Sequence, residues 1–458
     1  MTLSLHPREL TSPQHLHWRL PSSKSLTARR LLLHALEEGG ALLPLELDAD
    51  TPEDIRVLVS ALEAHRRGEP VIHVGASGTA MRFLTAYLAA TTHYPLRLEG
   101  ADRQHERPIA PLVTALRGAG ADISYLEAEG FPPLVIAPSR LEGELLELDA
   151  SSSSQYLSAL LLLSPRLSPG YCIELGDKPL ASAPYAAMTL QLLGEVGYRW
   201  QQEGTRYHYL GKDQRSKVQP LRDEADWSAA SYAYVLTKLL PLGSSCFLSR
   251  LRYPSLQGDS EALLGRFALL GVRSEVQEEG ILLRHEAAPS IGEMRWEFNS
   301  CPDLVPSFAV LGCALGLPFH FTGVAHLRLK ESDRLTALVT ELAKLGYGLE
   351  LGVDHLSYAG RPTKLTAGDP LPTLATYRDH RMAMALALLA LKHPGLQIAD
   401  TEVVAKSFPS YWQQLDSVLQ RQWQLKVCAE KITFLENLSL FLEFYQQVVG
   451  LHGNVVLF

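Results

Sequence analysis

Cysteine is scarce in this chain of 458 residues, and no apolar run is long enough for a membrane-spanning helix. The longest helix-favouring apolar run, Met382 to Leu391, covers ten residues, whereas a bilayer needs about 20. The opening segment MTLSLHPREL has no apolar core of signal-peptide length. The five cysteines form no ligand-spaced pair, which argues against a disulfide framework or a zinc site: Cys172, Cys246, Cys301, Cys313 and Cys428. We therefore expect reduced thiols and a cytoplasmic protein.

Positive charge is also in short supply. Lys and Arg number 42 against 50 Asp and Glu, giving a net charge of −8, which argues against a general binder of nucleic acid or anionic membranes. The Gly-rich segment GASGTAMR lacks the GK[ST] of a P-loop, and the chain has no HExxH or GxSxG. The composition, 46% hydrophobic and 20% charged, is that of a globular protein, and the length predicts two domains or a repeat architecture.

One kind of segment recurs six times along the chain. A short polar head leads into an apolar, helix-favouring run rich in Ala and Leu. The heads begin at residues 23, 78, 153, 228, 303 and 379, with spacings of 55, 75, 75, 75 and 76. Such a near-constant period predicts an internal repeat. Helices that are apolar on all sides must be surrounded by protein, so we expect them at the centre of each domain.

A second, amphipathic helix follows each apolar one, usually ending near a Gly before a strand-like stretch. Each repeat is therefore predicted to run strand–helix–strand–helix–strand, with three repeats in each half of the chain. The polar segment 203–224 predicts the crossing between the halves. The expected amphipathic helices lie within 51–65, 108–126, 184–200, 259–276, 331–351 and 407–420, and the strand-like stretches include 71–74, 95–100, 134–138, 171–175 and 245–251.

Eight cations stand at the starts of these elements. The first turn of a helix has unpaired N–H groups and the positive end of the helix dipole, which favour anions. If the heads converge, the sequence predicts a basic pocket for small phosphates or carboxylates on an acidic protein. The alternative is that these are ordinary solvated helix ends. The eight are Lys24, Arg29, Arg82, Arg107, Lys330, Arg334, Arg381 and Lys406.

Three carboxylates lie among these cations, at Asp303, Glu331 and Asp379. A carboxylate beside an anionic substrate is a candidate general acid or base, and we assign that role to Asp303 and Glu331. Asp379 is predicted to be mainly a helix N-cap. His380, in the first turn of the same helix, is interpreted as a hydrogen-bonded structural group.

Nine segments together resemble the EPSP synthase family, the 3-phosphoshikimate 1-carboxyvinyltransferases, over roughly residues 18–422. They are PSSKSLTAR, GASGTAMRFL, HERPI, SSSSQYLSALL, DWSAASY, LQGD, LRLKESDRL, TYRDHRMAMA and AKSFPSYW. The resemblance implies an α/β (α+β) two-domain enolpyruvyl transferase fold with six inverse βαβαββ units, three per domain, around apolar central helices. It implies a discontinuous first domain, 1–18 plus 223–426, and a second domain, 19–222. Residues 427–458 are left as an extra helical tail.

The resemblance also implies a reaction and its partners. The enolpyruvyl group of phosphoenolpyruvate moves to the 5-hydroxyl of shikimate 3-phosphate and phosphate is released, with no metal or organic cofactor and no nucleic-acid or membrane partner. We expect a monomer, with self-association through the tail as the alternative. Asp303 matches the proton acceptor and Glu331 the donor, with Lys24 or Lys406 as alternative donors.

The resemblance also implies which residues contact each substrate, and Lys24 and Gln155 are matched to both. Shikimate 3-phosphate is matched by Lys24, Ser25, Arg29, Ser153, Ser154, Gln155, Ser182, Asp303 and Lys330. Phosphoenolpyruvate is matched by Lys24, Gly78, Arg107, Gln155, Arg334, Arg381 and Lys406. The chain departs from the family pattern at Ser22, Ala28, Ala76, Phe83, Ala183 and His326.

Two other functions compete with this one. The enolpyruvyl transferase that acts on UDP-N-acetylglucosamine shares the fold but uses a reactive loop cysteine. Here the only cysteine before residue 200 is Cys172, in the strand-like YCIEL. A catalytically silent binding protein is the second alternative, and the retained charges argue against it.

Overall fold

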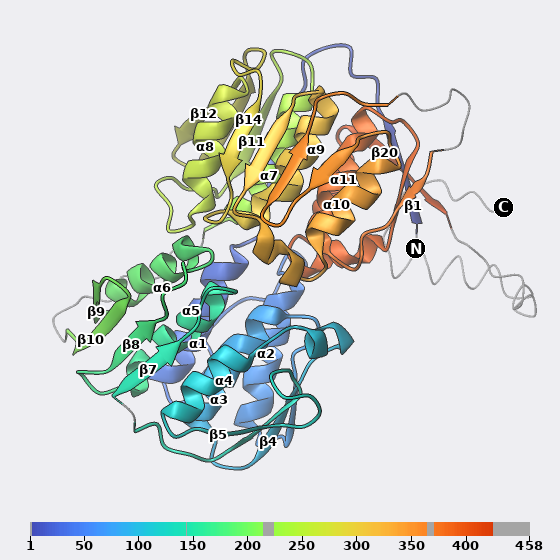
Figure 1. The fold of residues 1–458 in the computed structure, drawn as a ribbon. Coiled ribbons are helices and arrows are strands. Elements are labelled where there is room, and N and C mark those ends of the chain that lie inside the picture. Colours follow the sequence, from blue (N-terminus) through green and yellow to red (C-terminus); the bar gives the residue numbers. More distant parts are fainter. Residues whose placement is uncertain (1, 143, 214–223, 364–370, 425–458) are drawn as a thin grey trace, which may run out of the picture.

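The computed structural model describes residues 2–142, 144–213, 224–363 and 371–424, which form two domains of mixed α/β structure (Figure 1). Each domain has its own hydrophobic core. One core joins Leu3 to Leu20 with side chains from Ala225 to Leu419, and the other draws on Ala28 to Tyr209. The boundaries at 18 and 222 stay a prediction, and the tail 427–458 lies outside the described residues. No described helix is both long enough and apolar enough to cross a bilayer.

The second domain contains two four-stranded sheets, ordered β3-β4-β6-β5 and β7-β8-β10-β9. The first is built from β3 (Val71–His73), α3 (Gly78–Thr91), β4 (Leu96–Glu99), the 3₁₀ helix η1 (Asp102–Glu106), α4 (Ala110–Gly118), β5 (Asp122–Tyr125) and β6 (Leu134–Ala137). The other is built from β7 (Leu145–Leu148), α5 (Ser154–Leu162), η2 (Ser164–Arg166), β8 (Cys172–Leu175), α6 (Ala183–Glu195), β9 (Tyr198–Glu203) and β10 (Arg206–Lys212). Helices α1 (Lys24–Glu37) and α2 (Glu53–Arg66) precede them, and the described residues pair no strand between these two helices.

The first domain contains three such sheets, ordered β12-β13-β11-β2, β14-β15-β17-β16 and β18-β19-β1-β20. The first holds β2 (His15–Arg19), α7 (Trp227–Leu239), β11 (Ser245–Ser249), α8 (Asp259–Leu269), β12 (Val272–Gln277) and β13 (Gly280–His285). The next holds β14 (Met294–Glu297), η3 (Pro302–Leu304), α9 (Val305–Leu315), β15 (Phe319–Thr322), η4 (Ala325–Leu329), α10 (Arg334–Ala343), β16 (Leu349–Leu351) and β17 (His355–Tyr358). The last holds β18 (Thr373–Leu374), α11 (His380–Ala387), η5 (Leu388–Leu391), β19 (Leu396–Ala399), η6 (Thr401–Lys406), α12 (Tyr411–Leu415), β20 (Leu419–Gln424) and β1 (Thr2–Pro7).

All of these sheets share one pairing pattern. Two strands that flank an apolar helix run parallel, as β3 with β4 and β14 with β15, and the remaining pairs are antiparallel. The N-terminus completes two sheets of the first domain, because β2 pairs parallel with β11 while β1 pairs antiparallel with β19 and β20. The whole second domain is thus inserted between β2 and α7.

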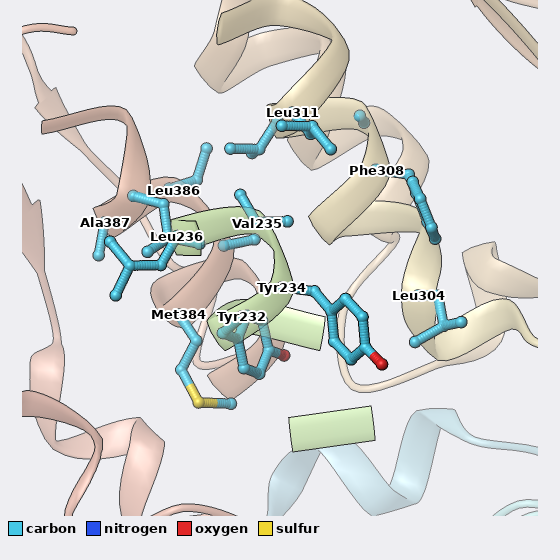
Figure 2. Close-up of a cluster of buried hydrophobic side chains, with 14 of the residues drawn as sticks. Tyr232, Tyr234, Val235, Leu236, Leu304, Phe308, Leu311, Met384, Leu386 and Ala387 are labelled. Atoms are coloured by element: carbon cyan, nitrogen blue, oxygen red, sulfur yellow. The ribbon is translucent and has the colours of Figure 1, made fainter. Parts of the chain in front are cut away.

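The predicted apolar helices begin close to their polar heads. Ser23, Ser77, Ser153, Asp226 and Asp379 are the N-caps of α1, α3, α5, α7 and α11, and each side chain accepts a backbone N–H of the first turn. In the first domain α7, α9 and α11 pack against one another, and Tyr232, Phe308 and Met384 lie in their shared core (Figure 2). These side chains are at most 1% exposed. The helices are therefore stabilised by burial inside the domain, as expected for helices that are apolar on all sides.

Two predictions of local structure are wrong. The segment 203–224 does not begin as a crossing, because Arg206–Lys212 is β10, which pairs with both β9 and β8. The predicted helix within 407–420 is confined to Tyr411–Leu415, and the chain then enters β20. β20 forms because β1, more than 400 residues away, offers it an antiparallel edge. A local helical pattern cannot report such pairing.

Two glycines near the end of α8 give a matched test of this fold. Gly271 follows the helix at φ +82°, and a Cβ there would lie 2.1 Å from the carbonyl oxygen of Ala287. Gly265, inside α8, has nothing within 4 Å of such a Cβ. We expect Gly271→Ala to lower the free energy of unfolding by more than about 2 kcal/mol. Gly265→Ala should raise it by up to about 1 kcal/mol. Melting temperatures of the two variants check this, and equal shifts would contradict it.

Candidate active site

A cleft between the two domains collects most of the predicted site residues. The second domain contributes the beginnings of α1, α3, α5 and α6, and the first domain contributes η3, the 330–334 segment and the beginning of α11. Of the fifteen predicted residues, fourteen line the cleft: Lys24, Ser25, Arg29, Gly78, Arg107, Ser153, Ser154, Gln155, Ser182, Asp303, Lys330, Glu331, Arg334 and Arg381. The fifteenth, Lys406, lies behind Glu331, with Nζ 3.2 Å from Glu331 Oε1.

Arg334 holds three carboxylates at once. Its Nε donates to Asp379 Oδ2 at 2.8 Å, Nη1 to Asp303 Oδ1 at 2.8 Å and Nη2 to Glu331 Oε2 at 2.9 Å. The residue is 1% exposed, so these charge-assisted bonds form away from water. A planar guanidinium with fixed donor directions can orient three partners in this way, which a lysine cannot.

Asp303 is held by a second arginine and by a tyrosine from the other domain. Arg381 Nη2 donates to its Oδ2 at 2.7 Å, and the Tyr185 hydroxyl donates to the same oxygen at 3.2 Å. Burial raises the pKa of Asp303, but the neighbouring cations, led by Arg381, lower it more, so the net pKa falls below its usual value. The carboxylate therefore stays ionised and able to accept a proton.

Glu331 is bound to both domains through Lys406. The Lys406 ammonium donates to Glu331 and, at 3.0 Å, to the carbonyl oxygen of Ala76 in the second domain. Burial raises the pKa of Glu331, but cations led by Lys406 lower it to well below its usual value. Glu331 is therefore ionised in this structure.

The cations of the second domain have few acidic partners. Arg29 donates to Thr189 Oγ1 at 2.7 Å and to Ser158 Oγ at 3.1 Å, and its guanidinium lies 5.2 Å from the centre of the Phe83 ring. Arg107 has two buried nitrogens, Nε and Nη1, with no hydrogen-bond partner among the described residues.

Arg82 and Lys24 complete this set. Arg82 donates to Gln104 Oε1 at 3.1 Å and to two backbone carbonyls, all neutral acceptors. Burial lowers the pKa of Arg29 and of Arg82 to about 10. Lys24 differs, because Asp54 Oδ2 lies 2.9 Å from its Nζ. A buried guanidinium without a carboxylate favours an incoming anion.

The described part of the cleft is thus strongly basic on the second-domain side. Seven cationic side chains line it against two carboxylates, and both carboxylates, Asp303 and Glu331, come from the first domain. Ser182 adds a buried hydroxyl with no partner in the described residues, on a backbone with φ +53°. The arrangement fits a substrate with several negative charges and hydroxyl groups.

Asp379 and His380 lie together at the beginning of α11. Asp379 is the predicted N-cap, since its Oδ1 accepts the N–H of Arg381 at 2.9 Å, and it also binds Arg334. The predicted hydrogen bonds of His380 are wrong, because neither ring nitrogen has a hydrogen-bond partner among the described residues, and Nδ1 lies 3.8 Å from Asp379 Oδ1. Burial lowers the pKa of His380 well below its usual value, and the adjacent Lys24 acts in the same direction. Burial, together with the nearby cations, therefore keeps the ring neutral.

Sequence reasoning missed several side chains of the site. The Tyr185 hydroxyl donates to Asp303, Thr79 Oγ1 accepts from Gln155 Nε2 at 3.1 Å, and Asp54 pairs with Lys24. Only Tyr185 left a sequence signal, because it lies three residues after Ser182 at the start of the same helix. The other two come from contacts between separate helices.

Comparison with known proteins now identifies the family. The family model described as EPSP synthase (3-phosphoshikimate 1-carboxyvinyltransferase) matches residues 12–415. A protein of Bacteroides fragilis strain YCH46 named 3-phosphoshikimate 1-carboxyvinyltransferase is 41% identical over 400 residues, covering 87% of this chain and 93% of the relative. The chain belongs to the EPSP synthase family. A Syntrophobacter fumaroxidans protein of the same name is 35% identical over 420 residues, covering 87% of this chain and 96% of the relative.

Solved EPSP synthases share the fold. The structure of EPSP synthase from Acinetobacter baumannii superposes with a TM-score of 0.67 at 21% sequence identity, covering 92% of this chain and 99% of that one. At this identity the match concerns the two-domain fold, which confirms the predicted fold class. Cys172, which the competing transferase would need as a reactive thiol, lies in β8, and burial raises its pKa.

Lys330 provides a test of the basic cleft through pH. Burial lowers its pKa to about 8, with Asp303 opposing the shift, so the ammonium is charged below pH 8 and neutral above it. Its contribution to anion binding is therefore present below about pH 8 and lost as the pH rises through that value. We expect sulfate, whose charge is constant over this range, to bind roughly tenfold more weakly at pH 9.5 than at pH 6.5. Titration calorimetry measures this, and Lys330→Arg should remove most of the dependence; an unchanged slope in that variant would contradict the assignment.

Proposed function

We propose that this protein transfers the enolpyruvyl group of phosphoenolpyruvate to the 5-hydroxyl of shikimate 3-phosphate and releases phosphate. The observation that carries the proposal is the collection of seven cations from both domains around Asp303 and Glu331. Both substrates are phosphate and carboxylate anions, so they supply the negative charge that the second-domain arginines lack. The names of the relatives support the same reaction.

The two substrates divide the cleft between them. Shikimate 3-phosphate takes the side lined by the beginnings of α1, α5 and α6, where serine hydroxyls suit a polyhydroxy ring: Lys24, Ser25, Arg29, Ser153, Ser154, Gln155, Ser182, Asp303 and Lys330. Phosphoenolpyruvate takes the side where α3 faces α10 and α11: Lys24, Gly78, Arg107, Gln155, Arg334, Arg381 and, behind them, Lys406.

The reaction proceeds by addition and elimination. The 5-oxygen bonds to C2 of phosphoenolpyruvate while its proton passes to a base and C3 receives a proton from an acid. The resulting tetrahedral adduct loses phosphate as the C2–O bond breaks, and the new methyl group returns a proton to restore the double bond. Negative charge builds up on the departing phosphate as its bond to C2 breaks, so fixed cations around it stabilise that transition state.

Asp303 is the proposed base for the 5-hydroxyl. Its two oxygens accept bonds from Arg334 and Arg381, which makes it a weak base. Phosphoenolpyruvate bound to the same two arginines draws their charge away from the carboxylate. The pKa of Asp303 then rises toward its usual value, and its basicity appears only when the second substrate is in place.

Glu331 is the proposed proton donor to C3. Its lowered pKa keeps it ionised, so it must gain a proton before it can give one. Lys406, whose Nζ is 3.2 Å away, is the adjacent source, and it is also an alternative donor. Lys24 is the other alternative; burial lowers its pKa, but Asp54 and Glu331 together raise it more, so its pKa lies above the usual value.

We further propose that the protein works in the cytoplasm as a monomer that binds neither nucleic acid nor membranes. The cysteines of the described residues, Cys172, Cys246, Cys301 and Cys313, are all free, as in a reducing compartment. The proposed contacts of both substrates come from one chain, which supports a monomer because no second copy is needed to supply them.

One assay tests the proposal directly. Purified protein is given phosphoenolpyruvate with and without shikimate 3-phosphate, and phosphate release is followed. We expect release only with both. Release that requires UDP-N-acetylglucosamine instead would support the competing transferase, and no release with either acceptor would support the silent binding protein.

Asp303→Asn separates chemistry from binding. The amide keeps the shape of the carboxylate but cannot accept the hydroxyl proton, so we expect kcat to fall by about 10³-fold or more. Shikimate 3-phosphate should bind within tenfold of the wild-type affinity by calorimetry, because its other contacts remain. Turnover within tenfold of wild type would remove Asp303 from the role of base.

Gly78→Ala tests the position of Arg107. A Cβ on Gly78 would lie 2.2 Å from Arg107 Nη1 and 2.7 Å from Cζ, so the guanidinium must move. We expect the KM for phosphoenolpyruvate to rise roughly tenfold, while that for shikimate 3-phosphate changes little. Gly118→Ala, at the end of α4, is the matched control because nothing lies within 4 Å of its Cβ. Steady-state kinetics with each substrate varied in turn give the two values, and equal increases for both substrates would contradict the assignment.

A further inference from the structure

Arg103 reaches across the cleft to the backbone of two site residues. It belongs to η1 in the second domain, and its Nε donates to the carbonyl oxygen of Glu331 at 3.1 Å. Its Nη2 donates to the carbonyl oxygen of Lys330 at 3.5 Å. Both acceptors belong to the first domain, so these bonds exist only while the domains are together.

The two carbonyls lie where the backbone has no regular structure of its own. Lys330 ends η4, and α10 begins at Arg334, so Lys330 and Glu331 lie in the irregular link between the two helices. Helical hydrogen bonds do not fix this link. A charged donor from outside therefore has a direct effect on where the Lys330 and Glu331 side chains point.

The segment that carries Arg103 also carries second-domain parts of the site. Gln104 Nε2 donates to the Ala76 carbonyl at 2.8 Å, and its Oε1 accepts from Arg82. Arg107 follows directly after η1. Residues 103–107 therefore link the cations of the second domain to the acidic link of the first, and Arg103 is the member that crosses.

Glu106 orients the Arg103 side chain for this contact. Its carboxylate pairs with Nη1 of Arg103, which leaves Nε and Nη2 to face the first domain. The planar guanidinium then presents two donors to two successive carbonyls. A lysine has one nitrogen and cannot serve both with this geometry.

We propose that Arg103 is a positioning residue, which holds Lys330 and Glu331 against Arg107 in the closed cleft without touching either substrate. The inference rests on the proposed function, since the residues it positions are the proposed acid and a proposed substrate contact. Without Arg103, each substrate still finds its own contacts, but the two halves of the site are less often at the correct distance. Catalysis is then lost while binding of shikimate 3-phosphate is retained.

The test compares Arg103→Gln with Arg97→Gln. Arg97 lies in β4 of the same domain and pairs with Glu99, so its loss removes an arginine without touching the cleft. We expect Arg103→Gln to lower kcat/KM for phosphoenolpyruvate roughly 10- to 100-fold, with Arg97→Gln within twofold of wild type. Arg103→Lys should recover part of the loss. Calorimetry should give a dissociation constant for shikimate 3-phosphate within threefold of wild type in all variants, with unchanged melting temperatures.

Small-angle scattering separates this inference from the proposed function. Wild type should contract when both substrates, or sulfate at saturating concentration, are added, and Arg103→Gln should contract less. Arg103→Gln within threefold of wild type in kcat/KM, or an equal loss in Arg97→Gln, would overturn the inference. If the wild-type protein shows no phosphate release, the proposed function fails, and the difference in contraction with sulfate still decides the role of Arg103.

Discussion

The ion pairs of Arg334 are the constraint on which the site depends. One buried guanidinium fixes Asp303, which follows β14, Glu331, which follows η4, and Asp379, which caps α11. These carboxylates come from two adjacent sheets of the first domain, so Arg334 joins the repeats into one surface. Buried charges are tolerated only when paired and hydrogen-bonded, and here each carboxylate has at least two donors. The cost of burying them is offset inside the first domain, before any ligand arrives.

The second domain has the opposite balance of charge, with cations that lack acidic partners among the described residues. Arg29 and Arg82 donate to hydroxyls, an amide and carbonyls, and two nitrogens of Arg107 have no hydrogen-bond partner in the part of the chain that the structure describes. None of the three forms an ion pair with a carboxylate of the described residues. Such a surface is stabilised by a bound anion and destabilised by further cations placed opposite it. The two domains contact each other through hydrogen bonds of Arg103, Lys406 and Tyr185, and an anion bound between them would add a further attraction.

The elements were predictable where local chemistry decides them. Ser23, Ser153 and Asp379 precede apolar Ala- and Leu-rich runs, and a capping side chain followed by such a run has one good conformation. The period of 75 residues followed from the same signal. The pattern could not predict strand pairing between distant segments, as between β1 and β20. Which strands pair depends on the packing of the whole fold and not on the local sequence.

The same distinction between local sequence signals and long-range contacts applies to the candidate site. Its cations stand at helix beginnings, where residue type and position can be read together, and the family resemblance then assigns them to substrates. Arg103 and Asp54 left no signal, and Tyr185 left only its place after Ser182, since the importance of all three lies in a partner on another element. Of these, Arg103 and Tyr185 form their bonds across the cleft. Contacts between the two domains depend on how the domains are placed relative to each other. The pattern of the repeats reports the elements within each repeat and not this placement.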